Sequence, residues 1–365
     1  MEIEVFKQDL SDQWSFKSEK MFDGFKSLMV FLNYYTFSTF KLHVGLTADN
    51  IRLFVPETVL YMEGLYFYVD SVNVPDATNA ELIVDGKSLQ GKTGDRIVYR
   101  NYSRSARPEQ IVWDHLNSEV INPSDIRREI RYLTLEAVPN LGNASIQYQN
   151  SYGNVATQIE TLCTSYDFGI RETAQSLSEP GNKLEIYRGR DLSQIVEFSE
   201  DYENLTKSGY QNNTLDESTT ALVFGEGEGS DRQSVIVNPT IEGLARKELY
   251  VDARDLQQNS DEANLTNAEY QAALTNRGNA KLAERKRILT LTGETPVNSK
   301  LFKLGVDYWL GDTVTIKSKL FNLRKESVIT TIKKTYDSKG LFIEPIFGKE
   351  TPTIFDILGR ESKGV

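Results

Sequence analysis

Apolar and polar residues alternate in short segments over the first hundred residues. In Phe40–Val44 every second residue is apolar, which is the period of a strand with one buried face. Leu65–Val69 is rich in aromatic residues, and Glu81–Val84 leads into Asp85–Gly86, a dipeptide typical of two-residue hairpin turns. Short strands separated by turn signals at this spacing predict a barrel or a sandwich.

The hydrophobic period changes to that of a helix after about residue 105. Pro108 suits the first position of a helix, which we expect to end before Pro123. The positions that recur near one face of this helix are Ile111, Val112, His115, Leu116 and Val120. A second helix is expected over 154–165, followed by strands over 168–172 and 183–187. The segment therefore predicts an α+β module inserted between strand-rich regions.

After residue 201 the pattern returns to strands, arranged around one long helix. Thr266–Glu269 matches a capping box and helix-forming residues follow it, so we expect a helix over about 261–287. The strands expected in this region cover 221–224, 289–291, 312–316, 327–333 and 341–344. Asp337–Gly340 predicts the hairpin turn between the last two of them.

These patterns divide the chain into four segments. Residues 1–104 form a strand-rich domain, 105–200 an inserted α+β domain, and 201–345 a second strand-rich domain that contains the long helix. Residues 346–365 form a C-terminal tail. The predicted fold class is therefore α+β and rich in β-structure.

The net charge of −11 is distributed unevenly along the chain. Residues 281–365 hold 16 basic and 10 acidic side chains, a net charge of +6, so the first 280 residues carry −17. An acidic surface argues against stable nucleic-acid binding, because contacts to phosphate depend on Lys and Arg. It suits a protein past which DNA slides without sticking; the alternative is a surface charge that keeps the protein in solution.

Three features of the sequence bear on the location of the protein. Cys163 is the only cysteine, so the chain alone forms neither a disulfide nor a cysteine-based zinc site. The first ten residues lack the pattern of a secretory signal. Ser27–Leu46 is the most apolar run, but Asn33, Lys41 and His43 interrupt it, so we expect no membrane span. The pattern indicates a soluble protein made in the cytoplasm.

Few residues suit catalysis or cofactor binding. His43 is predicted on the polar side of a strand and His115 within a helix, and nothing joins them. Cys163 follows Leu162 on an apolar helix face, where cysteine behaves as a small hydrophobic residue rather than as a nucleophile. In Gly225–Asp231 glutamates separate the glycines and no Lys-Ser/Thr pair follows, which predicts a flexible turn and no phosphate site. We expect no enzymatic activity, no cofactor and no metal.

One group of charged residues offers two interpretations. Asp252 and Asp255 flank Arg254 at the end of a predicted strand. Two carboxylates at this spacing suit an acid site or a divalent-cation site. Alternatively, Arg254 pairs with the carboxylates and fixes a corner of the chain or a contact between subunits, a frequent role of bidentate Arg–carboxylate pairs. The second interpretation is favoured.

The stretch Gly243–Leu256, with the sequence GLARKELYVDARDL, resembles the signature of siphophage tail hub proteins. These hubs are the structural amino-terminal modules of tail-associated lysins. Further segments resemble parts of that family in the same order along the chain: Gly64–Val69, Val84–Leu89, Arg96–Val98 and Leu310–Ile316. The resemblance covers about residues 60–345, with the long helix between its last two segments.

The resemblance implies two barrel-like tube domains with an inserted α+β domain, as in the hubs of contractile tails. It also implies a homotrimer, in which six tube domains form a pseudo-sixfold ring that docks onto the distal tail protein. The tail tube or tape-measure protein and receptor-binding proteins are further partners. The protein would be assembled in the host cytoplasm into the tail tip of the virion. The family has no catalytic residues in this module, so the candidate residues are interface or structural ones: Arg246, Asp252, Arg254 and Asp255.

Two other functions remain open. One is a peptidoglycan hydrolase that uses carboxylates, and the other is a receptor- or carbohydrate-binding module whose aromatic side chains stack on sugars. The tryptophans are Trp14, Trp113 and Trp309; we expect Trp113 and Trp309 to lie in the core. The sequence ends at Val365, soon after the last predicted strand; if it is complete we expect a hub without an attached lysin, and if it is part of a longer chain the missing part is where an activity would lie.

Overall fold

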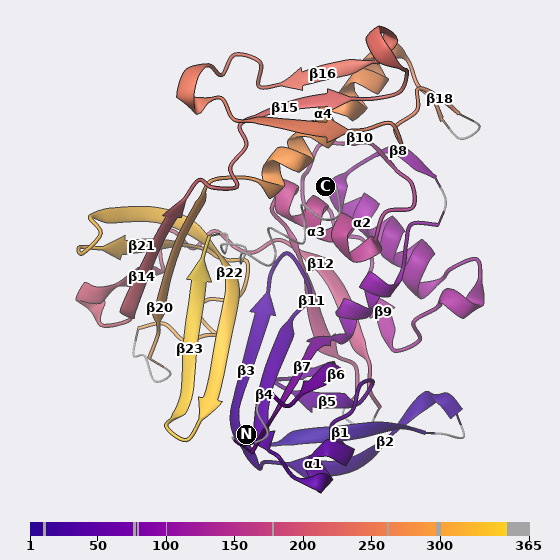
Figure 1. Ribbon diagram of the computed structural model, residues 1–365. Coiled ribbons are helices and arrows are strands. Elements are labelled where there is room, and N and C mark those ends of the chain that lie inside the picture. The colour runs from indigo at the N-terminus through magenta and orange to yellow at the C-terminus, as the bar shows by residue number, and fades with distance from the viewer. Residues whose placement is uncertain are drawn as a thin grey trace.

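The computed structural model describes residues 1–348 apart from 10–11, 76–77, 79, 100, 177–178, 261–262 and 297–300. Most of the predicted C-terminal tail lies outside the described residues, as do the first two residues of the expected long helix. Most of the strand residues belong to one sheet, and two smaller modules lie beside it (Figure 1).

The large sheet has 13 strands and contains both ends of the described chain. Its N-terminal strands are β1 (Ile3–Asp9), β2 (Asp12–Phe22), β3 (Phe25–Asn33), β4 (Thr39–Gly45), β5 (Val59–Met62), β6 (Leu65–Asn73) and β7 (Glu81–Ser88), with the short helix α1 (Ala48–Leu53) between β4 and β5. Its C-terminal strands are β13 (Glu197–Ser199), β14 (Thr206–Asn213), β20 (Ile288–Glu294), β21 (Thr313–Ser318), β22 (Leu323–Asp337) and β23 (Gly340–Phe347). Every strand predicted in these regions is present, and Asp337 pairs with Gly340 at the predicted hairpin turn.

The two halves of this sheet meet where β3 pairs with β22. The main order is β14-β20-β23-β22-β3-β4-β7-β6-β5-β1-β2, and β21, with β13 beside it, is also bonded to β22. The antiparallel register runs from Thr331 opposite Asn33 to Tyr336 opposite Leu28. A single apolar core lies against strands from both halves and includes Leu28, Val30, Ile329 and Ile332. The first and last strands of the chain are therefore one structural unit.

The N-terminal half of the sheet curls back on itself. Glu63, in the turn between β5 and β6, accepts a hydrogen bond from Lys334 Nζ of β22 at 2.5 Å. The order of strands places β22 four steps from β6, which is about 19 Å in a flat sheet. Contact across this distance requires a barrel-like curl. The expected pair of barrel-like tube domains stays a prediction.

The predicted hairpin turn at Asp85–Gly86 is wrong. Both residues lie inside β7, where Gly86 pairs with Phe40 of β4. A Cβ on Gly86 would lie 2.0 Å from the carbonyl oxygen of Tyr68, so the glycine is required by close packing at the irregular β6–β7 pairing. Tertiary packing, and not a turn, explains the glycine at this position.

The inserted α+β module contains the two predicted helices. Helix α2 (Pro108–Leu116) begins at Pro108 and continues as a wider helical turn to Ile121, before Pro123. Helix α3 (Val155–Tyr166) packs against α2 over a second apolar core, which also includes Phe6, Tyr66 and Tyr68 of the large sheet. The strands of the module are β8 (Tyr102–Ala106), β9 (Leu133–Leu135), β10 (Ile146–Asn150), β11 (Gly169–Ala174) and β12 (Asn182–Tyr187).

A third module consists of a small sheet covered on one face by the long helix. The sheet has the order β16-β15-β17, formed by β15 (Thr220–Phe224), β16 (Ser234–Val237) and β17 (Glu248–Asp252). Helix α4 (Asn267–Glu284) begins with the predicted capping box between Thr266 and Glu269. A two-stranded connection, β18 (Asn259–Ser260) with β19 (Ala263–Asn264), precedes the helix. Gly278 lets α4 approach the sheet, since a Cβ there would lie 2.7 Å from Val223 and Val237 methyl carbons.

The large sheet and the first insertion meet at Tyr34, which is fully buried after β3. The Tyr34 hydroxyl accepts a hydrogen bond from Gly189 N at 3.1 Å. A Cβ on Gly169 would lie 2.2 Å from the Tyr34 carbonyl oxygen, and one on Gly311 2.3 Å from the Tyr34 ring. Two glycines from distant parts of the sequence, Gly169 and Gly311, thus make room for one tyrosine.

Asp312 fixes the same junction. Its carboxylate accepts hydrogen bonds from Arg190 N at 2.8 Å, from Arg190 Nη2 at 2.7 Å and from Trp309 N at 2.8 Å. Nearby, the Tyr187 hydroxyl donates to the Leu310 carbonyl at 2.8 Å. The late Gly-Asp segment therefore holds the end of the first insertion against the C-terminal strands. The predicted boundaries near 104, 200 and 345 stay predictions.

Candidate interface at the end of strand β17

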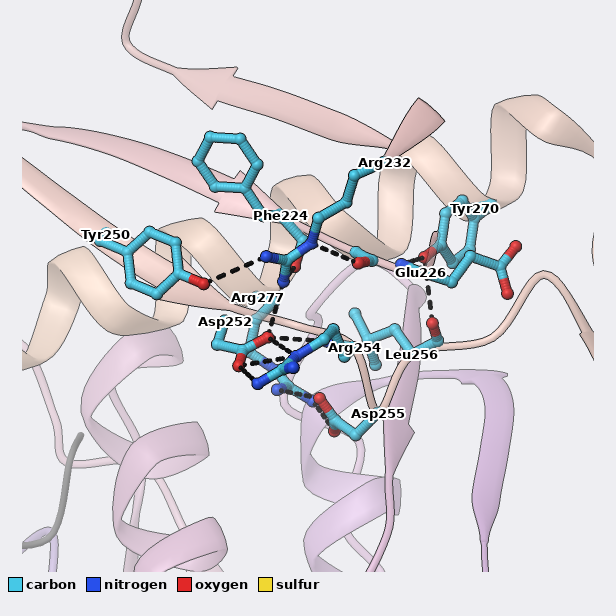
Figure 2. Close-up of polar contacts among 11 residues, drawn as sticks. Phe224, Glu226, Arg232, Tyr250, Asp252, Arg254, Asp255, Leu256, Tyr270 and Arg277 are labelled. Atoms are coloured by element: carbon cyan, nitrogen blue, oxygen red, sulfur yellow. Dashed lines mark hydrogen bonds and ion pairs between the residues drawn. The ribbon is translucent and has the colours of Figure 1, made fainter. Parts of the chain in front are cut away.

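Asp252, the last residue of β17, lies between two arginines (Figure 2). Arg254 Nη2 donates to Asp252 Oδ2 at 2.5 Å, and Arg232 Nη2 donates to Asp252 Oδ1 at 2.8 Å. Arg232 also donates to the carbonyl oxygens of Phe224 and Gly225, which anchors it to the end of β15. The carboxylate is therefore part of an ion-pair network that closes the end of the sheet.

This network keeps Asp252 ionised. Hydrogen bonds from the Arg254 guanidinium hold the pKa of Asp252 below its ordinary value, although partial burial acts in the opposite direction. A general acid in glycoside hydrolysis needs a raised pKa. The arrangement therefore opposes the acid-site interpretation of Asp252 and supports a role in fixing the chain.

Asp255 takes part in a different contact. Its two carboxylate oxygens accept from Arg277 Nη1 at 3.0 Å and from Arg277 Nη2 at 2.8 Å, a bidentate pair with α4. Arg277 also donates to the Gln149 carbonyl at 3.2 Å. Gln149 and Gln257 exchange two hydrogen bonds, each of 3.1 Å, between side chain and backbone. Asp255 thus helps to join the third module to β10 of the first insertion.

The divalent-cation interpretation finds no support in the part of the chain that the structure describes. No group of three or more His, Cys, Asp or Glu side chains in that part has the arrangement of a metal site. Asp252 pairs with Arg254 and Arg232, whereas Asp255 pairs with Arg277, so the two carboxylates do not converge on one site. Both carboxylates have their charge compensated without a metal ion.

Arg246 lies away from this cluster. It precedes β17, pairs with Glu248 at 2.7 Å and donates to the Ile241 carbonyl at 2.9 Å. The structure therefore places Asp252 and Arg254 together at the end of β17, Asp255 close by and paired with Arg277 of α4, and Arg246 at the opposite end of the same strand. The interface role expected of the four residues stays a prediction.

An apolar surface on this module was not predicted from the sequence, and we call it the open sheet face. It consists of side chains on the side of the sheet opposite α4: Leu222, Phe224, Ile236 and Tyr250. Leu222 is paired with Ile236 on one side and with Tyr250 on the other, so the three form one row. Tyr250 is 60% exposed and Ile236 47% exposed. The signal in the sequence is the unbroken apolar run of β15, which makes both of its faces apolar.

An aromatic pair ends the open sheet face next to the ion-pair network. The rings of Phe224 and Tyr250 lie 5.6 Å apart at an angle of 31°, and the Arg232 guanidinium lies 5.4 Å from the Phe224 ring (Figure 2). Arg232 also donates to the Tyr250 hydroxyl at 3.2 Å. Aromatic and arginine side chains are enriched at protein interfaces, so this composition is typical of a docking surface.

The residues with reactive side chains do not form a site. Cys163 is buried on α3 as predicted for a core residue, and burial raises the pKa of its thiol. His115 is buried in α2 between the rings of Tyr102 and Tyr148. His43 lies on β4, 3.4 Å from Glu81. His43 thus lies on a strand of the large sheet, whereas His115 lies on a helix of the first insertion, and the two side chains contact different residues.

Two other predictions concern tryptophans and membranes. Trp113 and Trp309 are partly buried against the two large apolar cores, close to the expectation, whereas the side chain of Trp14 lies outside the described residues.

Over the residues that the structure covers, no helix combines the length and the apolar character needed to cross a bilayer.

Comparison with known proteins identifies relatives of the whole described chain. The family model of the Siphovirus ReqiPepy6 Gp37-like protein matches residues 2–349. No curated protein sequence matches the chain. Among solved structures, the tail protein from Neisseria meningitidis MC58 is similar with a TM-score of 0.55 and 13% identity, over 95% of this chain and 97% of that one.

Two prophage proteins have a similar fold. The prophage tail protein gp18 from Listeria monocytogenes EGD-e has a TM-score of 0.51 and 16% identity, over 100% of this chain and 99% of that one. The 43 kDa tail protein of prophage MuSo2 from Shewanella oneidensis has a TM-score of 0.51 and 13% identity, over 95% of this chain and 97% of that one. At these identities the likeness concerns the fold alone.

Proposed function

Because the chain belongs to the Siphovirus ReqiPepy6 Gp37-like family of phage proteins, we propose that it is a structural hub of the phage tail tip. Three copies form a ring that caps or extends the tail tube and gates the passage of DNA during infection. The ring binds the distal tail protein and lies next to the tube or tape-measure protein. The protein acts by assembly in the virion and not by catalysis.

The observation that carries this proposal is the continuous sheet that joins both ends of the chain. Its N- and C-terminal strands share one core and one curved surface through the β3–β22 pairing. Two strand-rich halves held rigidly in this way suit repeated units of a tube wall, since a ring of three chains then presents six such halves. The acidic character of the first 280 residues, −17 in total, suits a channel that does not retain DNA.

The chemistry of the described residues supports an assembly role over a hydrolytic one. Asp252 and Asp255, the carboxylate pair considered for acid catalysis, are each engaged by arginine. A hydrolase of the glycosidase type requires two carboxylates with different protonation states. The depressed pKa of Asp252 opposes that arrangement.

The ring is tested by light scattering on the purified chain, alone and with the distal tail protein of the same phage. We expect the mass of a trimer and a complex of defined stoichiometry with the distal tail protein. A chain that stays monomeric at high concentration and does not bind the distal tail protein would contradict the proposal. Cleared zones in a cell-wall zymogram would overturn the non-catalytic role.

A further inference from the structure

The third module is inserted into a single hairpin of the large sheet. Its residues, 214–287, lie between β14 and β20, and these two strands pair with each other up to Asn213 opposite Ile288. The chain therefore enters and leaves the module at one place, through a narrow connection (Figure 1). The two segments of this connection are joined by a hydrogen bond from Ser218 N to the Arg285 carbonyl at 2.9 Å. A module attached in this way has a natural hinge at the base of the hairpin.

The third module also has an apolar core of its own. The small sheet and α4 enclose it, and Val223, Tyr270 and Leu274 in it are completely buried. Among the described residues, no member of this core belongs to the core of the large sheet or of the first insertion. By contrast, Phe6 and Tyr66 of the large sheet share a core with the helices of the first insertion. Movement of the third module therefore leaves its core buried, whereas the other two parts are fixed to each other.

Polar groups join the third module to the first insertion where α4 lies against β10. We call this group of residues the latch: Gln147, Gln149, Gln257, Asn276 and Arg277. The Gln149 side chain donates to the Gln257 carbonyl and accepts from Gln257 N, each at 3.1 Å. Asn276 Nδ2 donates to the Gln147 carbonyl at 3.0 Å, and Arg277 Nη2 to the Gln149 carbonyl at 3.2 Å. Water replaces such hydrogen bonds at a small net cost, and polar contacts between modules are typical of modules that move.

We infer that the third module is a hinged unit with two positions. In one it is docked on the first insertion through the latch, and in the other it has swung away about the base of the β14–β20 hairpin. The movement breaks the latch and the bond from Thr161 Oγ1 of α3 to Glu284 Oε1 of α4, but it opens none of the three apolar cores. A partner that binds one position better than the other shifts the module toward it. The device belongs to the single chain and does not depend on the proposed ring.

Pulsed electron paramagnetic resonance measures the movement as a distance between two nitroxide labels. The labels are attached to Leu244→Cys in the third module and Ile126→Cys in the first insertion, which are 101% and 63% exposed, whereas the native Cys163 is buried. We expect a docked and a swung population. Gln149→Leu removes both hydrogen bonds to Gln257 and should raise the ratio of swung to docked chains about tenfold or more. The docked distance alone, in both chains, would overturn the inference.

Two controls separate the hinge from a general loosening of the chain. Labels at Ile126→Cys and at Leu320→Cys, in the turn between β21 and β22 of the large sheet, should give one distance that Gln149→Leu leaves unchanged. Gln110→Leu is the matched substitution, because Gln110 donates to Asp114 Oδ1 at 2.9 Å within α2. It should not alter the ratio of the two populations. A control distance that changes together with the hinge distance would overturn the inference.

Asn276→Ala tests the latch by a milder change, in case Gln149→Leu reduces the yield of folded protein. Alanine suits the helix, and only the bond to the Gln147 carbonyl is lost. The ratio should rise in the same direction by a smaller factor, and an unchanged ratio would count against the latch. Labelled chains are diluted with unlabelled ones, so that only distances within one chain are measured. The outcome is therefore independent of whether the chain forms a trimer.

Discussion

Glu63 and Lys334 form an ion pair at 2.5 Å although three strands separate β6 from β22 in the sheet. Only 9% of the Glu63 side chain and 15% of the Lys334 side chain are exposed. The Tyr336 hydroxyl donates to the same carboxylate. The pair therefore holds the turn between β5 and β6 against the C-terminal half and maintains the curl of the sheet.

Glu63→Gln should destabilise the protein because it leaves the Lys334 ammonium largely buried without a countercharge. We expect the free energy of unfolding to fall by about 2–4 kcal/mol. Urea denaturation measures the change. Asp49→Asn is the matched control, since Asp49 forms an exposed pair with Arg52, and it should change the free energy by less than about 1 kcal/mol. Equal effects of the two substitutions would contradict a special role for Glu63.

Gly311→Ala should destabilise the junction at Tyr34 through two effects. Gly311 has a φ of +87°, and its added Cβ would lie 2.3 Å from the Tyr34 ring. Gly305 has nearly the same φ, +84°, but its Cβ would be 3.8 Å from the nearest atom. We expect a loss of about 1 kcal/mol for Gly305→Ala from backbone strain, and of about 3 kcal/mol or more for Gly311→Ala. Thermal or urea unfolding of both variants separates crowding from strain.

His115 should make the protein less stable in mild acid. Burial lowers the pKa of His115 to about 4, against an ordinary value near 6.5 in the unfolded chain. The unfolded state therefore binds the proton first, so stability is complete above pH 6.5 and falls as the pH approaches 4. The expected loss is about 3 kcal/mol. Tyr102 and Tyr148 enclose the ring, and Asp114 is the nearby charge that acts on it.

The measurement is the unfolding free energy of the wild type and of His115→Phe between pH 7.5 and pH 4. Other groups titrate in this range, so the difference between the two pH profiles isolates His115. His115→Phe should flatten the profile. Parallel profiles for the two proteins would show that His115 is not protonated on unfolding.

Asp255 and Arg254 are neighbours in the sequence, but substituting one or the other should change the stability of the protein by different amounts. Asp255→Asn weakens a bidentate pair with Arg277, whose side chain is only 20% exposed and also contacts β10. We expect a loss of about 1–2 kcal/mol and faster hydrogen exchange in β17 and α4. Arg254→Gln should leave stability within the error of the measurement, since Arg254 is 68% exposed. A larger effect of Arg254→Gln would contradict this assignment.

Local signals in the sequence were sufficient for most elements. Pro108 begins α2, and Thr266 with Glu269 caps α4, because both depend only on residues within one helical turn. The alternation in β4 and the turn at Asp337–Gly340 are similarly local. Such features are encoded by residues close in the sequence, so the sequence alone is enough to predict them.

The features that were missed depend on contacts between distant residues. Asp85–Gly86 has the sequence of a turn, but Gly86 pairs with β4 inside a strand. Its missing side chain leaves room for the carbonyl oxygen of Tyr68. The charged stretch around Asp252 suggested one site, yet Asp255 faces Arg277, a residue 22 positions away in the sequence. The open sheet face became visible only when the register placed Ile236 and Tyr250 beside Leu222. Pattern alone does not reveal which face of a doubly apolar strand is left uncovered.

The pairing of β3 with β22 can form only near the end of synthesis on the ribosome. Asn33 and Thr331 are neighbours in this pairing but 298 residues apart in the sequence. At synthesis rates of about 5–20 residues per second, roughly 15–60 s pass between the emergence of the two strands. During this time the edge of β3 that later receives β22 is open to other chains. A nascent chain that stalls before β22 therefore carries an unpaired edge, and its aggregation competes with translation.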